Sequence, residues 1–223
     1  MKYKCLIFDC DGILVDSETI SNKVMIEMAA SVGLTIDLQY AMENFSGVSI
    51  TSTIEYIRNN APAELPDDFE KEFRKRTFEL FRTELNPVKG IAELLEKITV
   101  PCCVASSGPR EKIQLSLTTT NLIHQFENRI FSSYDIGSWK PNPGIFLHAA
   151  KEMGFDPGEC AVIEDSIAGI KAARAGGFDV FGLANHSNVK ELENLGATVF
   201  YDMAELESLL DGRRSQSPLN FEL

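Results

Sequence analysis

The sequence predicts an α/β fold: a doubly wound, Rossmann-like parallel sheet with a small all-helical cap domain inserted into it. Three observations predict this fold class. Short apolar runs alternate with amphipathic segments along most of the 223 residues, several helical segments end at a glycine, and one interval between apolar runs is too long for a simple crossover.

Five apolar runs predict buried parallel strands, because strands covered on both faces are apolar along their whole length. They are Lys4–Phe8, Cys102–Ala105, Ala161–Ile163, Val180–Leu183 and Thr198–Tyr201. Amphipathic spacing between them predicts helices around Ile91–Ile98, Glu111–Leu122, Gly144–Met153, Ile167–Ala175 and Val189–Leu195. Gly154, Gly176 and Gly196 follow three of these helices, at the place where a left-handed terminating residue is expected.

The interval from Phe8 to Cys102 is about three times as long as a βαβ unit of roughly 30 residues. Apolar residues recur within it at helical spacing, as at Ile20, Val24 and Met28, and no β-branched run predicts a strand. The predicted organisation is a Rossmann-like core of residues 1–16 and 87–212, a helical cap domain of residues 17–86, and a C-terminal tail of residues 213–223.

Composition excludes several functional classes. With 33 Asp and Glu against 21 Lys and Arg, the net charge is −12, which leaves no broad basic surface for a nucleic-acid backbone. No apolar run reaches the roughly 18 residues of a membrane span, and the N-terminus lacks a signal-peptide pattern. Five cysteines without a C-x-x-C motif predict buried thiols rather than disulfides. We therefore expect a cytoplasmic monomer that acts on a small molecule and has no nucleic-acid or membrane partner.

Polar residues follow the predicted strands at their carboxyl ends, the edge where open α/β sheets bind ligands. If the first strand stays extended, Asp9 and Asp11 project to the same side and bring two carboxylates together. A divalent cation relieves the repulsion between such acids, and Glu164 and Asp165 would complete an oxygen-rich site of the kind that Mg²⁺ accepts. A solvated acidic turn is the alternative, but acids at the end of a buried strand need a partner.

Two further features suit an anion. Ser106-Ser107-Gly108 follows the second strand and leads into a helix, so that a hydroxyl and backbone N–H groups can cradle a phosphate. Lys140, placed before two prolines, offers a fixed cation. Taken singly, Ser106 is equally well explained as a helix-capping serine, and a lone lysine usually faces solvent.

Four segments carry a family resemblance. DCDGILVDSE, the SSG turn, KPNP and IEDSIAG match, in order and spacing, the four motifs of the haloacid dehalogenase-like superfamily, in its phosphatase branch with a small helical cap. The match spans nearly the whole chain. SSGPREK, YDIGSWKPNP and HAAKEMG are most similar to sugar-phosphate phosphatases of the phosphogluconate phosphatase type. The resemblance implies Mg²⁺-dependent hydrolysis of a sugar phosphate or sugar-acid phosphate, such as 6-phosphogluconate, through an aspartyl-phosphate.

The resemblance also implies catalytic roles. Asp9 would attack phosphorus as the nucleophile, and Asp11 would protonate the leaving alkoxide and then deprotonate water. Lys140 would pair with Asp9 and the transferring phosphoryl group, while Ser106 would bind the phosphoryl oxygens.

The implied ligands of Mg²⁺ are the Asp9 side chain, the Asp11 backbone carbonyl and Asp165, with Glu164 as a further ligand or a supporting base. Other residues of the turn and of the cap would face the substrate. These expected substrate-binding residues are Ser107, Gly108, Gly47, Val48 and Ser49.

Two alternatives to hydrolysis stay open. Mutases of the β-phosphoglucomutase type carry a cap histidine after the DxDG motif and a cap arginine after GVS, but Ser21 and Ile50 occupy those places here. A receiver-like phosphoacceptor combines similar residues on a similar sheet, yet has about half this length and no inserted lobe. The cap also contains KEFRKRTFELFR, which could face an anionic substrate, although its helical spacing favours a solvated surface.

Overall fold

The computed structural model describes residues 2–45, 48–184 and 188–212. Gly47 and the predicted tail, 213–223, lie outside the described residues. Within the described ranges, six parallel strands form one sheet in the order β3-β2-β1-β4-β5-β6. The strands are β1 (Cys5–Phe8), β2 (Cys102–Ser106), β3 (Ile130–Ser132), β4 (Cys160–Glu164), β5 (Asp179–Leu183) and β6 (Thr198–Phe200).

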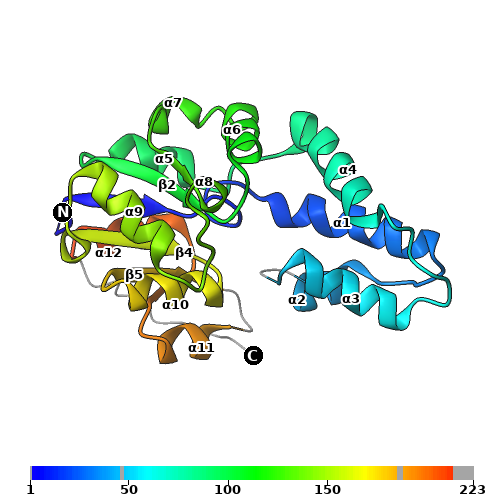
Figure 1. The fold of residues 1–223 in the computed structure, drawn as a ribbon. Helices are drawn as coiled ribbons and strands as arrows, with labels where there is room; N and C mark the ends of the chain where they lie inside the picture. Colours follow the sequence, from blue (N-terminus) through cyan, green and yellow to red (C-terminus); the bar gives the residue numbers. More distant parts are fainter. Residues whose placement is uncertain (1, 46–47, 185–187, 213–223) are drawn as a thin grey trace, which may run out of the picture.

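Helices cover both faces of this sheet, which confirms the predicted doubly wound fold (Figure 1). Because strand side chains alternate, Leu6 and Phe8 enter one apolar cluster and Cys5 and Ile7 enter the other. The first cluster contains side chains of α5 (Ile91–Lys97), α6 (Arg110–Thr119), α7 (Ile123–Phe126) and α12 (Met203–Leu210). The second contains side chains of α9 (Gly144–Met153), α10 (Ile167–Ala175) and α11 (Val189–Asn194). Short helices α8 (Ser133–Ile136) and η1 (Pro157–Glu159) complete the core.

The differences from the sequence prediction include one strand and one helix end. Strand β3 was not predicted, since its three residues, Ile130–Ser132, are too short for a periodic pattern. The left-handed residue after α10 is Gly177, with φ of +83°, and not Gly176, which has a right-handed φ of −79°. The terminating glycines Gly154 and Gly196 do have positive φ, as predicted.

Four helices form the cap, which stands to one side of the sheet (Figure 1). They are α1 (Ser17–Ser31), α2 (Leu38–Asn44), α3 (Ile50–Asn60) and α4 (Phe69–Glu84). The predicted helical spacing is confirmed, because Ile20, Val24 and Met28 are all buried. Among the described helices, none combines the length and the apolar character that a bilayer span requires.

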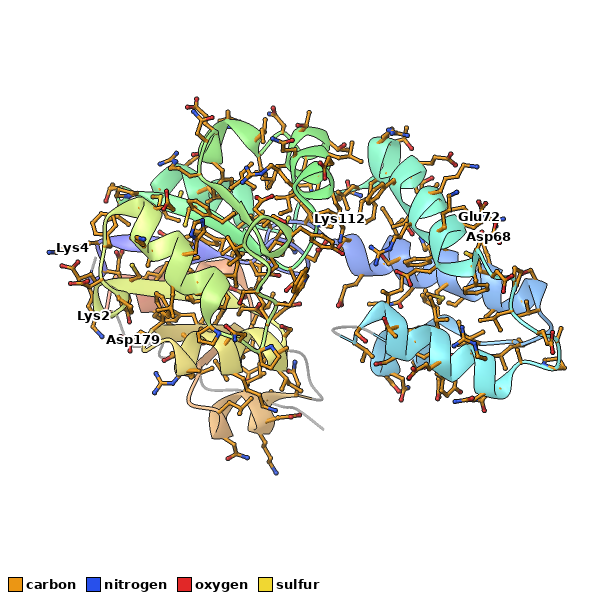
Figure 2. The ribbon with its side chains drawn as sticks, viewed as in Figure 1. Lys2, Lys4, Asp68, Glu72, Lys112 and Asp179 are labelled. Atoms are coloured by element: carbon orange, nitrogen blue, oxygen red, sulfur yellow. The ribbon has the colours of Figure 1, made fainter. Side chains whose placement is uncertain are left out.

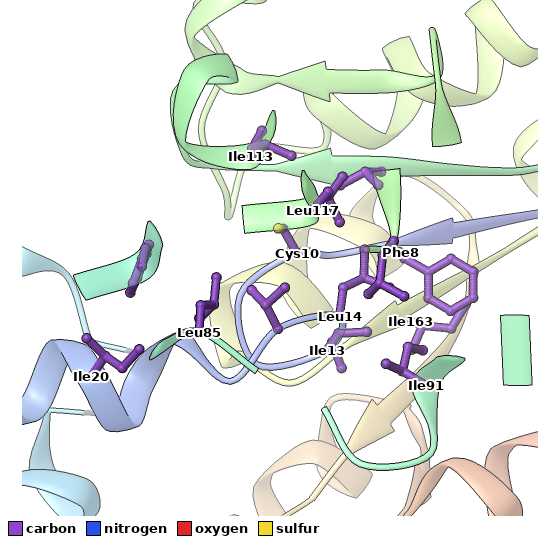
Figure 3. Close-up of a cluster of buried hydrophobic side chains, with 14 of the residues drawn as sticks. Phe8, Cys10, Ile13, Leu14, Ile20, Leu85, Ile91, Ile113, Leu117 and Ile163 are labelled. Atoms are coloured by element: carbon purple, nitrogen blue, oxygen red, sulfur yellow. The ribbon is translucent and has the colours of Figure 1, made fainter. Parts of the chain in front are cut away.

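The two connections between core and cap run side by side. The Asp16 N–H donates to the Asn86 carbonyl at 2.9 Å, and Val15 bridges to Pro87. Figure 3 shows the apolar cluster continuing from Phe8 through Cys10 and Leu14 to Ile20 and Leu85 at the base of the cap. We propose that the cap domain, residues 17–86, begins and ends at these paired connections. All five cysteines are buried free thiols, as predicted.

Candidate active site

A cavity of about 570 Å³ lies between the carboxyl edge of the sheet and the cap, and its size is typical of small-molecule sites. Its core wall comes from the ends of β1, β2 and β4, and its cap wall from α1, α3 and α4. Every predicted site residue that the structure describes lines this cavity: Asp9, Asp11, Val48, Ser49, Ser106, Ser107, Gly108, Lys140, Glu164 and Asp165.

The Lys140 ammonium joins two strand ends. Its Nζ donates to Asp9 Oδ1 at 2.5 Å and to Glu164 Oε1 at 2.6 Å, and its side chain is only 5% exposed. Burial lowers the pKa of Lys140, but the charges of these two carboxylates outweigh burial and raise that pKa above its ordinary value. Lys140 is therefore a fixed cation that orients Asp9, rather than a solvated surface lysine.

Glu164 is fully buried, and both of its oxygens accept hydrogen bonds. Oε1 accepts from Lys140, while Oε2 accepts from the backbone N–H groups of Asp165 and Ser166 at 2.8 and 2.7 Å. The carboxylate packs against the start of α10, where a Cβ on Gly169 would lie 1.8 Å from Oε1. Glu164 therefore fixes both Lys140 and the turn that presents Asp165.

Asp165 completes a group of carboxylates suited to a cation. Oxygens of Asp9, Glu164 and Asp165 lie within 4.8 Å of one another, close to the span of about 4.2 Å between opposite ligands of Mg²⁺. Among the described residues, no hydrogen bond or ion pair reaches the Asp165 carboxylate. Gly12 makes room for it, since a Cβ there would lie 1.9 Å from Asp165 Oδ2. These oxygen donors fit a hard divalent cation.

The Asp11 carboxylate lies apart from this group and has its own partners. Lys112 Nζ donates to Oδ2 at 2.7 Å and Ser17 Oγ donates to Oδ1 at 2.6 Å. The Asp11 carboxylate does not belong to the group formed by Asp9, Glu164 and Asp165, because β1 ends at Phe8 and the chain turns immediately afterwards. Asp11 would therefore offer the cation its backbone carbonyl rather than its carboxylate.

Charge is unbalanced at this edge of the sheet. Asp9, Asp11, Glu164 and Asp165 are four acids, whereas Lys112 and Lys140 are two cations, so the six groups carry −2 when all are ionised. Burial, with the charges of Glu164 and Asp11, raises the pKa of Asp9 to about 7 despite Lys140. Burial, with the charges of Glu164 and Asp9, raises the pKa of Asp165 well above its ordinary value. One divalent cation would balance this charge.

The environment of Asp11 shifts its pKa in the opposite direction. Burial raises the pKa of Asp11, but the charge and hydrogen bond of Lys112 and the hydrogen bond of Ser17 together hold it below its ordinary value. Asp11 is therefore ionised near neutral pH when no substrate is bound.

The turn after β2 is rigid. Ser106 is buried, and its Oγ accepts from the Gly108 N–H at 3.1 Å, while Ser132 Oγ donates to the Gly108 carbonyl at 2.6 Å. The Ser106 hydroxyl keeps its proton for a ligand oxygen, because a hydroxyl both accepts and donates. The turn leads into the N-terminus of α6, a position that favours an anion.

Sequence reasoning missed several residues that line the cavity. Lys112 lies on the first turn of α6, and its Nζ is 5.7 Å from the ring centroid of Phe81 on α4, so that it lies between core and cap (Figure 2). Tyr134 and Trp139, an exposed pair with ring centroids 5.3 Å apart, line the same cavity. Lys112 belongs to the SSGPREK segment, where its spacing of six residues from Ser106 was the available signal.

Comparisons with known proteins agree with this geometry. The sequence profile of the haloacid dehalogenase-like hydrolases matches residues 3–177. The chain belongs to this hydrolase family. It is 33% identical over 213 residues to 6-phosphogluconate phosphatase of Escherichia coli (strain K12), covering 95% of this chain and 96% of that protein.

Two solved structures of the haloacid dehalogenase-like family are also similar. A conserved protein of unknown function from Agrobacterium tumefaciens str. C58 has a TM-score of 0.86 and 29% identity, covering 94% of this chain and 98% of its own. A family hydrolase from Deinococcus radiodurans R1, solved with bound phosphate and sodium, has a TM-score of 0.82 and 29% identity. The match covers 95% of this chain and 96% of the Deinococcus chain. The predicted enzyme class, a phosphoric monoester hydrolase of this family, is confirmed.

Proposed function

We propose that this chain is a Mg²⁺-dependent phosphatase that hydrolyses a small sugar phosphate or sugar-acid phosphate, such as 6-phosphogluconate, through an aspartyl-phosphate on Asp9. One observation carries the proposal: Asp9, Lys140 and Asp165 converge at one edge of the sheet and face a single cavity with Ser106. The Escherichia coli relative supports the substrate class, and the phosphate bound to the Deinococcus hydrolase supports an anion site in this fold.

Asp9 is placed to act as the nucleophile, since Lys140 holds one of its carboxylate oxygens and the residue lines the cavity. The side chains of Asp9 and Asp165, with the Asp11 carbonyl, would hold Mg²⁺, which supplies the positive charge that an anionic nucleophile needs near a phosphate dianion. Lys140 and Ser106 then donate to the phosphoryl oxygens, where charge develops during transfer. Glu164 positions Lys140 for this role.

Asp11 is placed to move the protons. Its carboxylate lies beside the cavity with Lys112 and Ser17 bonded to its two oxygens, so its direction is fixed. After taking up a proton from solvent when the substrate binds, Asp11 would protonate the departing alkoxide, and the resulting carboxylate would take a proton from the water that attacks the aspartyl-phosphate. Lys112 favours the ionised form and therefore the second of these steps.

Hydrolysis is favoured over the mutase alternative by the cap wall of the cavity. Ser21 and Ile50 both line it, so the places of the mutase histidine and arginine hold a neutral hydroxyl and an alkyl group that face the substrate. Neither residue can bind a second phosphate as a guanidinium does. A receiver-like acceptor would not need this cap wall, because closing a site from water serves catalysis.

We further propose a cytoplasmic monomer. Five buried free thiols suit a reducing compartment, and size-exclusion chromatography tests the oligomeric state.

A panel of phosphorylated metabolites, assayed with Mg²⁺ and with EDTA, tests the function. We expect phosphate release from sugar phosphates or sugar-acid phosphates only with Mg²⁺, and none from the Asp9→Asn variant. Steady accumulation of a phosphorylated protein without phosphate release would support a phosphoacceptor instead. Conversion of one sugar phosphate into its isomer would support a mutase.

A further inference from the structure

Helix α4 carries the basic run KEFRKR, residues 71–76, and only part of it reaches the cavity. Phe73 and Arg74 line the cavity, whereas Lys71, Lys75 and Arg76 are absent from the described lining. Lys71, Lys75 and Arg76 are exposed, as expected for a solvated surface, whereas Arg74 is half-buried and faces the cavity.

Arg74 differs from the other cations of the cavity. Lys112 and Lys140 are bonded to the acids of the sheet edge, where the phosphoryl group would react. Among the described lining residues, Arg74 is the cation that the cap helices contribute. A substrate whose phosphate lies at the sheet edge extends its leaving group toward the cap, so a negative charge at the far end of that group would meet Arg74.

The present partner of Arg74 can be exchanged. Its Nε and Nη2 donate to the same oxygen, Glu70 Oε1, at 2.9 and 2.7 Å, and the two side chains are 40% and 47% exposed. Exposed pairs four residues apart on a helix contribute only about 0.3–0.5 kcal/mol. The planar guanidinium matches a carboxylate with two parallel hydrogen bonds, so a substrate carboxylate can replace Glu70 at little cost.

A second charge limits where an anion can bind. Glu18 on α1 also lines the cavity, so the acidic residues of the described lining lie on the core and on α1, whereas α4 contributes none. The side of the cavity formed by α4 is therefore where a substrate carboxylate gains most.

We propose that Arg74 binds the carboxylate of the substrate's leaving group and so makes this phosphatase selective for phosphorylated sugar acids over neutral sugar phosphates. The inference rests on the proposed phosphatase function and deepens it by assigning the acid end of the substrate to one residue of the cap.

The test compares 6-phosphogluconate with glucose 6-phosphate, which have six carbons and one phosphate each but differ in the carboxylate. We expect Arg74→Gln to lower kcat/KM for 6-phosphogluconate by about 10- to 100-fold, as for loss of a charged hydrogen-bonded pair, and to change that for glucose 6-phosphate less than about threefold. Arg74→Lys, which keeps the charge but not the planar fork, should fall between Arg74→Gln and the unmodified enzyme.

Arg76→Gln is the matched control. Arg76 lies on the same helix and donates from Nε to Glu72 at 2.8 Å, also four residues away, with a side chain 47% exposed, but it does not line the described cavity. We expect this variant to change kcat/KM for either ester by less than about twofold. An equal effect of Arg74→Gln and Arg76→Gln on 6-phosphogluconate would overturn the proposal.

Binding without turnover gives a second readout. In the Asp9→Asn background with Mg²⁺, calorimetric titration with 6-phosphogluconate should show Kd raised by Arg74→Gln in the same proportion as kcat/KM falls. Phosphatase activity in which Arg74→Gln affects both esters equally, or neither, would refute the role of Arg74 and leave the proposed function intact. An enzyme that releases phosphate from no ester would refute the proposed function itself.

Discussion

Replacing Lys140 with methionine removes the cation between two buried carboxylates. Lys140 Nζ lies 2.5 Å from Asp9 Oδ1 and 2.6 Å from Glu164 Oε1, and these side chains are 10% and 0% exposed. Removing one partner of a buried ion pair costs about 3–5 kcal/mol, because the other charge stays buried and unpaired. For a chain of this length each kcal/mol lowers Tm by about 2–4 °C, so we expect a fall of about 6–20 °C at pH 8 in EDTA.

Lys4→Met is the control for this prediction. Lys4 Nζ lies 2.6 Å from Glu159 Oε1, the same distance as in the Lys140–Glu164 pair, but its side chain is 66% exposed and lies at the end of the core far from Lys112 (Figure 2). An exposed pair contributes at most about 1 kcal/mol, so Tm should change little.

The loss of stability in Lys140→Met should depend on pH in one defined direction. Without Lys140, which lowers the pKa of Asp9, the folded-state pKa of Asp9 rises further, so the folded protein keeps a proton that the unfolded chain has lost. Stability then falls as pH rises between the ordinary and the raised pKa values, and the deficit of Lys140→Met should shrink from pH 8 to pH 5. Urea unfolding of wild type, Lys140→Met and Lys4→Met at each pH measures this deficit in the free energy of unfolding. A Lys140→Met variant as stable as Lys4→Met at pH 8, or a deficit that grows on acidification, would refute the reasoning.

The remaining predictions concern the proton shuttle, the metal pocket and the titration of Asp9. Asp11→Asn should still take phosphate from p-nitrophenyl phosphate in a rapid burst, but turn over about 10²- to 10⁴-fold more slowly, and wild-type hydrolysis of a sugar phosphate by this variant would contradict the acid–base role. Gly12→Ala should displace Asp165 and lower activity at least about 100-fold. Gly154→Ala, at a similar positive φ with open space around it, should cost only about 1–2 kcal/mol of stability. Equal activity in the two variants would show that the close approach of Gly12 to Asp165 is unimportant. In EDTA, wild type should lose stability relative to Asp9→Asn as pH rises from about 4 to 7, since the pKa of Asp9 is raised to about 7 by burial, and saturating Mg²⁺ should remove the trend in urea unfolding. A relative stability that increases with pH over that range in EDTA would mean that Asp9 ionises readily without a cation.

Much of the architecture could be predicted, because parallel strands buried on both faces leave continuous apolar runs. The convergence of Asp9, Ser106 and Asp165 follows from the rule that parallel strands present their carboxyl ends at one edge. The strand β3 could not be predicted, since Ile130–Ser132 is too short to show a pattern and is a strand only because it pairs with β2.

The partners of Asp11 were beyond the sequence for a different reason. Lys112 and Ser17 lie on two helices, one in the core and one in the cap, and only the path of the chain after Phe8 brings them to the same carboxylate. The function of Arg74 was similarly hidden, because periodicity identifies the apolar face of α4 but does not show which polar residues face another domain.

Calorimetric titration of the metal-free protein with Mg²⁺ tests the central claim most directly, namely that the excess of acids at the sheet edge forms a divalent-cation site. Asp165→Asn removes one acid of this site, whereas Asp179→Asn removes an acid bonded to Lys2 and Tyr3 at the other end of the core. We predict that wild type and Asp179→Asn bind one Mg²⁺ with similar affinity and that Asp165→Asn binds at least about 100-fold more weakly. Equal Mg²⁺ affinity in Asp165→Asn and wild type would contradict the account.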